Sequence, residues 1–74
     1  MTAIVLNGTP VESTNHTVLD LVSAVTGHPT ADLERGALAV AVARNSFVVA
    51  RGAWSSTPLV DGDEIELVTA LQGG

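Results

Sequence analysis

Short apolar runs separated by turn residues predict a chain built mainly of strands. The first run covers residues 3–6 and is followed by Asn7-Gly8, a pair that supplies the positive φ angles of a tight hairpin turn. A return strand is expected to begin at Val11. The chain is therefore predicted to open with a β-hairpin.

One stretch has the period of an amphipathic helix. Thr17 followed by Asp20 is close to a capping box, and Gly27 suits the position just past a helix end. Apolar residues at spacing i, i+3, i+4 and i+7 are expected to share one face, and these are Val18, Leu21, Val22 and Val25. The pattern predicts one helix of about nine residues, a length that depends on tertiary packing.

The middle of the chain predicts a loop and a second strand pair. Residues 27–36 read as a loop with a short helical turn at residues 30–35. The apolar run over residues 37–43 fits a central strand, either covered on both faces or offering one face to a partner. Residues 44–46 form a turn, and residues 47–50 return as a strand.

The last third is expected to be irregular at first and then to form a final strand. Residues 52–58 have no clear period, and Trp54 is predicted to anchor them to the core with its indole N–H paired. Asp61-Gly62-Asp63 predicts a tight turn before residues 64–70, where acidic and apolar residues alternate at first, as in a strand with one wet face.

This order predicts an α+β domain of the β-grasp type. A mixed sheet of about four to five strands would pack on one main helix, with the last strand in the centre beside the first. We expect residues 1–70 to form the domain and residues 71–74 to form a flexible tail.

Composition excludes several classes of function. The 74 residues carry eight acids, three arginines, no lysine and a net charge of −5, so nucleic acid and anionic membranes are unfavourable partners. There is no cysteine and there are only two histidines, so we expect neither a disulfide nor a bound metal. No apolar run is long enough to cross a membrane and no signal peptide is evident, so a cytoplasmic monomer is expected.

Four of the eight acids lie close together near the end of the chain: Asp61, Asp63, Glu64 and Glu66. They fit a polar turn followed by the outer face of a strand. They also fit an acidic patch that steers a basic partner, and the two interpretations are compatible.

The sequence closes on Leu71-Gln72-Gly73-Gly74. A tail without side chains on its last two residues can enter a narrow channel and presents a terminal acyl group. A terminal glycine pair is weak evidence by itself, because chain ends are often frayed.

The stretch 39–54 has Asn45-Ser46 at a hairpin, a Val-Val pair, and Arg51 three residues before Trp54. In these features it resembles the ThiS family, the bacterial sulfur carrier proteins of thiamine biosynthesis. The Asp-Gly-Asp turn, the last strand and the closing Gly-Gly are similar too, so the resemblance covers nearly the whole chain. Departures occur where the family commonly has Gly, a polar residue and Pro, here Ser46, Phe47 and Ala50.

The resemblance implies a sulfur-transfer chemistry centred on Gly74. A partner resembling ubiquitin-activating enzymes, an E1-like adenylyltransferase, would use ATP and Mg to adenylate the Gly74 carboxylate. Sulfur from cysteine, supplied by a cysteine desulfurase or an equivalent donor, would convert it to a thiocarboxylate. Thiazole synthase would accept the sulfur, and the carrier itself would have no catalytic site and bind no cofactor.

Partner-binding residues are expected in the tail and on the sheet. Leu71, Gln72 and Gly73 would seat the tail in the activating enzyme. A docking patch is expected to include some of Val40, Val42, Phe47 and Val68, with about half of the four in the core. We expect Arg51 and Trp54 to brace the irregular connection, with partner contact as the other interpretation.

Two other functions fit the same features. The small subunit of molybdopterin synthase shares the fold, tail and activation but gives its sulfur to a pterin. A binding-only ubiquitin-like module would carry a fortuitous Gly-Gly end. A free-standing enzyme has little support, because no nucleophile, base and orienting group occur at workable spacing.

Overall fold

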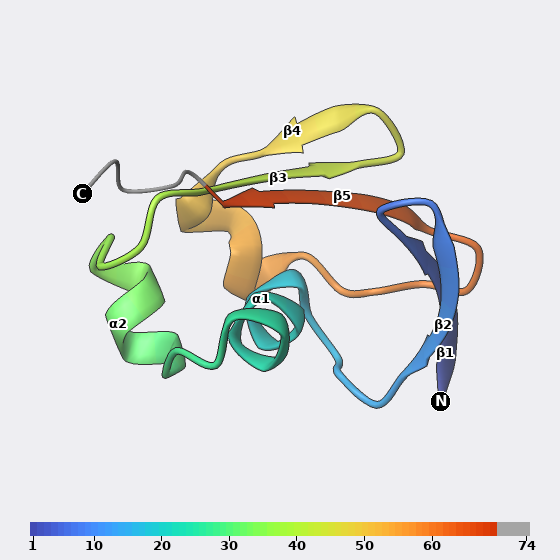
Figure 1. Cartoon of the computed structure of the whole chain (residues 1–74), viewed down its shortest axis with the longest axis horizontal. Coiled ribbons are helices and arrows are strands. Elements are labelled where there is room, and N and C mark those ends of the chain that lie inside the picture. Colours follow the sequence, from blue (N-terminus) through green and yellow to red (C-terminus); the bar gives the residue numbers. More distant parts are fainter. Residues whose placement is uncertain (70–74) are drawn as a thin grey trace.

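Five strands form one mixed sheet, and the helices cover only one of its faces (Figure 1). The structure is a computed structural model that describes residues 1–69. In chain order the elements are β1 (Thr2–Leu6), β2 (Thr9–Ser13), α1 (Val18–Thr26), α2 (Thr30–Glu34), β3 (Val40–Arg44), β4 (Phe47–Val49), the 3₁₀ helix η1 (Arg51–Ser56) and β5 (Glu64–Thr69).

The strand order is β2-β1-β5-β3-β4, which places the last strand in the centre. β1 and β5 run parallel, whereas β5 is antiparallel to β3. Each of the outer strands is joined to its neighbour by a hairpin. The predicted α+β class and β-grasp topology are confirmed, including the pairing of the last strand with the first.

Both hairpins turn on an asparagine in the left-handed region. Asn7 and Gly8 have φ angles of 48° and 83°, as the Asn-Gly pair predicts. At the second hairpin Asn45 and Ser46 have φ angles of 50° and 73°. Ser46 adopts there a conformation that glycine reaches more easily, because a Cβ atom disfavours positive φ.

The caps of α1 form as the sequence predicts. Thr17 Oγ1 accepts a hydrogen bond of 3.2 Å from the Asp20 amide, and Gly27 ends the helix with φ 76°. The predicted apolar face is wrong at one position, because Val25 is 48% exposed whereas Leu19 is buried. The buried face of α1 is therefore made by residues of its first two turns.

The core lies between α1, α2, η1 and the inner face of the sheet. Ile4, Val42 and Ile65 from the strands meet Val18 and Leu33 from the helices, all 2% exposed or less. With Trp54, these mainly aliphatic side chains form one layer, as the apolar composition allows in so short a chain.

The connection that the sequence left irregular is the 3₁₀ helix η1. Trp54 is 1% exposed, and its indole Nε1 donates 2.9 Å to the Val49 carbonyl oxygen, as predicted. Arg51 lies over the Trp54 ring at 4.8 Å and donates to the carbonyl oxygens of Leu33 and Leu38. The geometry gives Arg51 and Trp54 a bracing role.

The predicted short helical turn is confirmed as α2, but the central strand is shorter than its apolar run. β3 begins at Val40, and residues 37–39 lie before it. Along β3, Val42 is 2% exposed while Ala41 faces solvent. The strand is thus covered on one face only, the second of the two arrangements that its composition allowed.

Candidate functional site

β5 leads directly to the end of the chain from the centre of the sheet. It runs between β1 and β3 and reaches Thr69, the last described residue (Figure 1). Four candidate residues, Leu71, Gln72, Gly73 and Gly74, lie outside the described residues, as does the predicted tail at 71–74. What the structure describes is the strand from which that segment continues.

The turn of the first hairpin binds β5 through Asn7. Its backbone N–H donates 2.9 Å to the Ile65 carbonyl oxygen. Its carboxamide then makes a pair of bonds with Leu67: Nδ2 donates to the Leu67 carbonyl oxygen at 3.2 Å, and Oδ1 accepts from the Leu67 amide at 2.8 Å. The side chain takes the place of a strand residue beside β5.

The turn of the second hairpin binds the other end of β5 in a similar way. The Asn45 backbone N–H donates 2.8 Å to the Glu64 carbonyl oxygen. Asn45 Oδ1 accepts 2.9 Å from the Glu64 amide, while Nδ2 donates to Asp63 Oδ1. Sequence reasoning identified both asparagines as turn formers and missed these contacts with β5.

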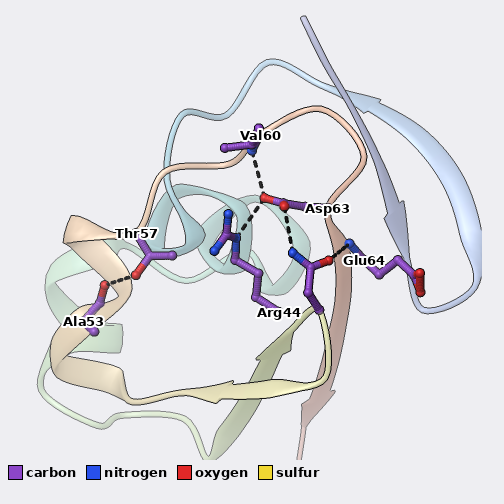
Figure 2. A network of polar contacts seen from close by, with 7 residues as sticks. Arg44, Ala53, Thr57, Val60, Asp63 and Glu64 are labelled. Carbon is purple, nitrogen blue, oxygen red and sulfur yellow. Dashed lines mark hydrogen bonds and ion pairs between the residues drawn. The ribbon is translucent and has the colours of Figure 1, made fainter.

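Asp63 is the centre of a buried polar network at the start of β5 (Figure 2). Its Oδ2 accepts 2.9 Å from Arg44 Nε and 2.8 Å from the Val60 amide. Burial alone would raise the pKa of Asp63, but the hydrogen bonds from Arg44, Val60 and Asn45 outweigh it and lower the pKa below its ordinary value.

The position of Asp63 corrects the predicted acidic patch. Asp63 is only 4% exposed and serves the fold. Asp61 is exposed, and its Oδ1 accepts 2.9 Å from the Ala3 amide. Glu64 and Glu66 are exposed acids on β5, so three of the four acids remain at the surface and only Asp63 is lost from the predicted patch.

The side of the sheet away from the helices is the candidate docking surface. We call it the outer face, and it includes Ala41, Ala43, Glu64, Glu66 and Val68. Val68 is 62% exposed near the end of β5, and Ala41 lies opposite it on β3. An apolar centre beside two carboxylates suits a partner with apolar and basic groups.

A shallow hollow of about 350 Å³ adjoins Val68. Its other lining residues are Ala39, Val40, Ala41 and Arg51. The hollow lies beside the last residues of β5, so a partner side chain that entered it would contact the protein near Thr69, the last described residue.

The four residues of the predicted docking patch do not lie together. Val42 is buried and belongs to the core, and Val40 is half-buried. Phe47 is 77% exposed, but it pairs with Arg44, which pairs with the inward-facing Ile65. Since side chains alternate along strands, Phe47 and Val68 lie on opposite faces of the sheet.

Phe47 instead adjoins a groove between β4 and η1. The groove has a volume of about 520 Å³, and Arg44, Val49, Ala53 and Thr57 contribute to its lining. The register of the strands places Phe47 and Val68 on opposite faces of the sheet. This register depends on the pairing of β3 with β5, which the local sequence around Phe47 does not reveal.

Within residues 1–69 the structure has no cluster of three His, Asp or Glu side chains that could hold a metal ion. No helix in this part of the chain has the length and apolar content needed to span a membrane.

Comparison with known proteins gives a family and matching solved structures. The model of the ThiS family matches residues 3–74. The crystal structure of the thiamine biosynthesis protein ThiS from Geobacter metallireducens matches with a TM-score of 0.69 and 28% sequence identity, covering 99% of this chain and 100% of that one. No curated protein matches the sequence.

Proposed function

Since the chain belongs to the ThiS family, sulfur carriers of thiamine biosynthesis, we propose that it carries sulfur as a thiocarboxylate on Gly74. The observation that supports this most directly is the placement of β5. The strand lies at the centre of the sheet between β1 and β3, and its last residue, Thr69, is five residues before the terminal Gly74. Because the strand before the tail is fixed in the sheet, less conformational entropy is lost when the short tail enters an enzyme channel.

The proposed chemistry needs a partner, because a free carboxylate is a poor electrophile. A Gly74 carboxylate oxygen attacks the α-phosphorus of ATP on an E1-like adenylyltransferase, and pyrophosphate leaves. The outer sulfur of a persulfide, formed from cysteine by a desulfurase or an equivalent donor, then attacks the acyl carbon, and AMP leaves. A second thiol of the partner attacks the donor sulfur of the resulting acyl disulfide, which breaks the S–S bond and releases the Gly74 thiocarboxylate and a disulfide. ATP and Mg belong to the activating partner, and this chain supplies the acyl group and binds no cofactor.

Thiazole synthase is the proposed acceptor, and the cytoplasm is the proposed compartment. The carrier contributes no catalytic side chain to either step, so its role is to be recognised and to present Gly74. Leu71, Gln72 and Gly73 are proposed to lie in the partner's channel.

The outer face is the proposed docking surface for the activating enzyme. Val68 and its neighbour Ala41 provide the apolar contact, and Glu64 and Glu66 attract a basic rim. Because Phe47 lies on the opposite face, it is proposed as a contact only for a partner that also wraps around the β4 edge.

The intact mass of the chain tests the proposal. The protein is incubated with ATP, Mg, the adenylyltransferase and a sulfur source, beside a variant that lacks Gly74. A mass gain matching one oxygen replaced by sulfur, present only with Gly74, is the expected result. An unchanged mass, with an enzyme active on another carrier, would leave the chain as a binding-only module.

Val68→Ser tests the docking surface, with Val25→Ser as the matched control. Both valines are exposed, at 62% and 48%, but Val25 lies on α1, away from the outer face. We expect Val68→Ser to raise the KM for adenylation about fivefold, as for loss of a central apolar contact. Equal KM values for the two variants would show that Val68 does not contact the activating enzyme.

Gene deletion separates the acceptors. Loss of the gene is expected to create a thiamine requirement that the wild-type chain relieves. Loss of molybdoenzyme activity with normal thiamine synthesis would assign the sulfur to a pterin instead.

A further inference from the structure

The edge of β5 that faces β1 is only partly paired over the last described residues of the strand. In residues 1–69 the parallel ladder between β1 and β5 consists of Val5 with Glu64 and Leu6 with Ile65, and it ends there. On the other side, β3 continues to pair up to Thr69. The last part of β5 therefore has a strand on one side only.

The Asn7 carboxamide fills the next position on the open side. After Leu6 the backbone turns into the hairpin, but the Asn7 side chain reaches Leu67 and pairs with both of its backbone polar groups, the carbonyl oxygen at 3.2 Å and the amide at 2.8 Å. Among the hydrogen bonds described for residues 1–69, this pair is the last on that side of β5.

We propose that Asn7 is a positioning residue for sulfur loading, because its carboxamide holds Leu67 and thereby fixes the direction in which β5 delivers the tail. The inference rests on the proposed function. Without the carboxamide, residues from Leu67 onwards can separate from the sheet on one side, and binding must then order more of the chain. The loss should raise KM and leave the chemical step unchanged.

Asn45 provides a matched control from the same fold. Asn7 and Asn45 each occupy the first position of a two-residue turn, at φ 48° and 50°, and each side chain binds β5. Asn45, however, binds Glu64 at the start of the strand. Glycine tolerates both backbone conformations, so Asn7→Gly and Asn45→Gly remove the carboxamide without straining the turn.

Hydrogen exchange and adenylation kinetics together test the inference. In Asn7→Gly the Leu67 amide is expected to exchange at least tenfold faster, and the KM for adenylation, measured as pyrophosphate release with an E1-like adenylyltransferase, to rise about fivefold with kcat within twofold. In Asn45→Gly faster exchange is expected at Glu64, with KM within twofold of wild type.

Asn7→Asp adds a readout that a general loss of stability would not produce. The introduced carboxylate can accept from the Leu67 amide but can donate to the Leu67 carbonyl oxygen only when protonated. The Leu67 amide chemical shift is therefore expected to titrate with the new carboxyl group, whereas the Glu64 shift does not follow it.

Two results would overturn the positioning role. One is a KM of Asn7→Gly within twofold of wild type, and the other is an equal rise of KM in Asn45→Gly, which would indicate general destabilisation. Failure of the proposed function looks different, because the wild-type chain itself would then release no pyrophosphate.

Discussion

Replacing Asp63 by Asn removes the charge of a carboxylate that is buried, the only such side chain within residues 1–69, and leaves the shape of the side chain unchanged. Asp63 is 4% exposed and accepts hydrogen bonds from Arg44, Asn45 and the Val60 amide, which join β3, the second turn and the start of β5. An amide in its place keeps one oxygen acceptor and turns the other position into a donor that faces Asn45 Nδ2.

The expected loss follows from these contacts. Bonds to an ionised partner contribute about 1.5–3 kcal/mol each, and an unsatisfied buried donor costs about 1–3 kcal/mol. Because the amide retains two of the three bonds in weakened form, we expect the free energy of unfolding to fall by about 2–3 kcal/mol at neutral pH. A 74-residue domain has a total stability on the order of 5 kcal/mol, so the variant should be close to half as stable.

Urea unfolding followed by the fluorescence of Trp54, the only tryptophan, measures this loss. The neighbouring Glu64→Gln makes the same charge change on an exposed side chain, and its effect should stay within about 0.5 kcal/mol. A loss in Asp63→Asn as small as in that control would refute the role given to the network.

The pH dependence gives the same experiment a second criterion. The pKa of Asp63 in the folded protein lies below its ordinary value. The ionised Asp63 therefore contributes fully to the free energy of unfolding above its unfolded pKa of about 3.9. That contribution is lost as the pH falls through the folded pKa. The difference in free energy of unfolding between wild type and Asp63→Asn should therefore become smaller as the pH falls below about 4. A constant difference across that range would contradict the ionised state of Asp63.

Three further substitutions test other parts of the fold by urea unfolding. Ser46→Gly should stabilise the protein by about 0.5–1 kcal/mol, because φ is 73° there; a loss of stability would contradict the strain. Arg51→Lys should cost about 1–2 kcal/mol, since an ammonium cannot bridge both carbonyl oxygens and stack on the indole; an unchanged midpoint would show the contacts to be unimportant. Trp54→Phe should cost about 1–3 kcal/mol for the unpaired carbonyl oxygen and lost ring area, measured by circular dichroism because the fluorophore is gone.

The local elements of the fold could be predicted because their signals are local. Asn7-Gly8 has few options other than a tight turn, and Thr17 and Gly27 define both ends of α1. Trp54 was expected in the core because no other large apolar side chain occurs in its segment. The 3₁₀ conformation of the segment around Trp54 could not be predicted from the spacing of apolar residues, because η1 buries only one side chain among its six residues.

The site was less predictable because its residues meet over long distances in the sequence. Asp63 reads as one of four clustered acids, but Arg44, 19 positions earlier, brings it inside. Phe47 and Val68 both read as exposed apolar strand residues, and only the pairing of β3 with its two neighbours separates their faces. The bond between Asn7 and Leu67 spans 60 positions, and the asparagines at both hairpin turns were its only signal.

Transfer of labelled sulfur from the purified carrier tests the central claim most directly. The chain would be loaded with an isotopically heavy sulfur, freed of the activating enzyme and small molecules, and mixed with thiazole synthase and its other substrates. We expect one heavy sulfur atom to leave Gly74 for each thiazole formed, with the carrier returning to its carboxylate mass. Thiazole that contains only unlabelled sulfur, or a carrier that keeps its label while thiazole forms, would contradict the account.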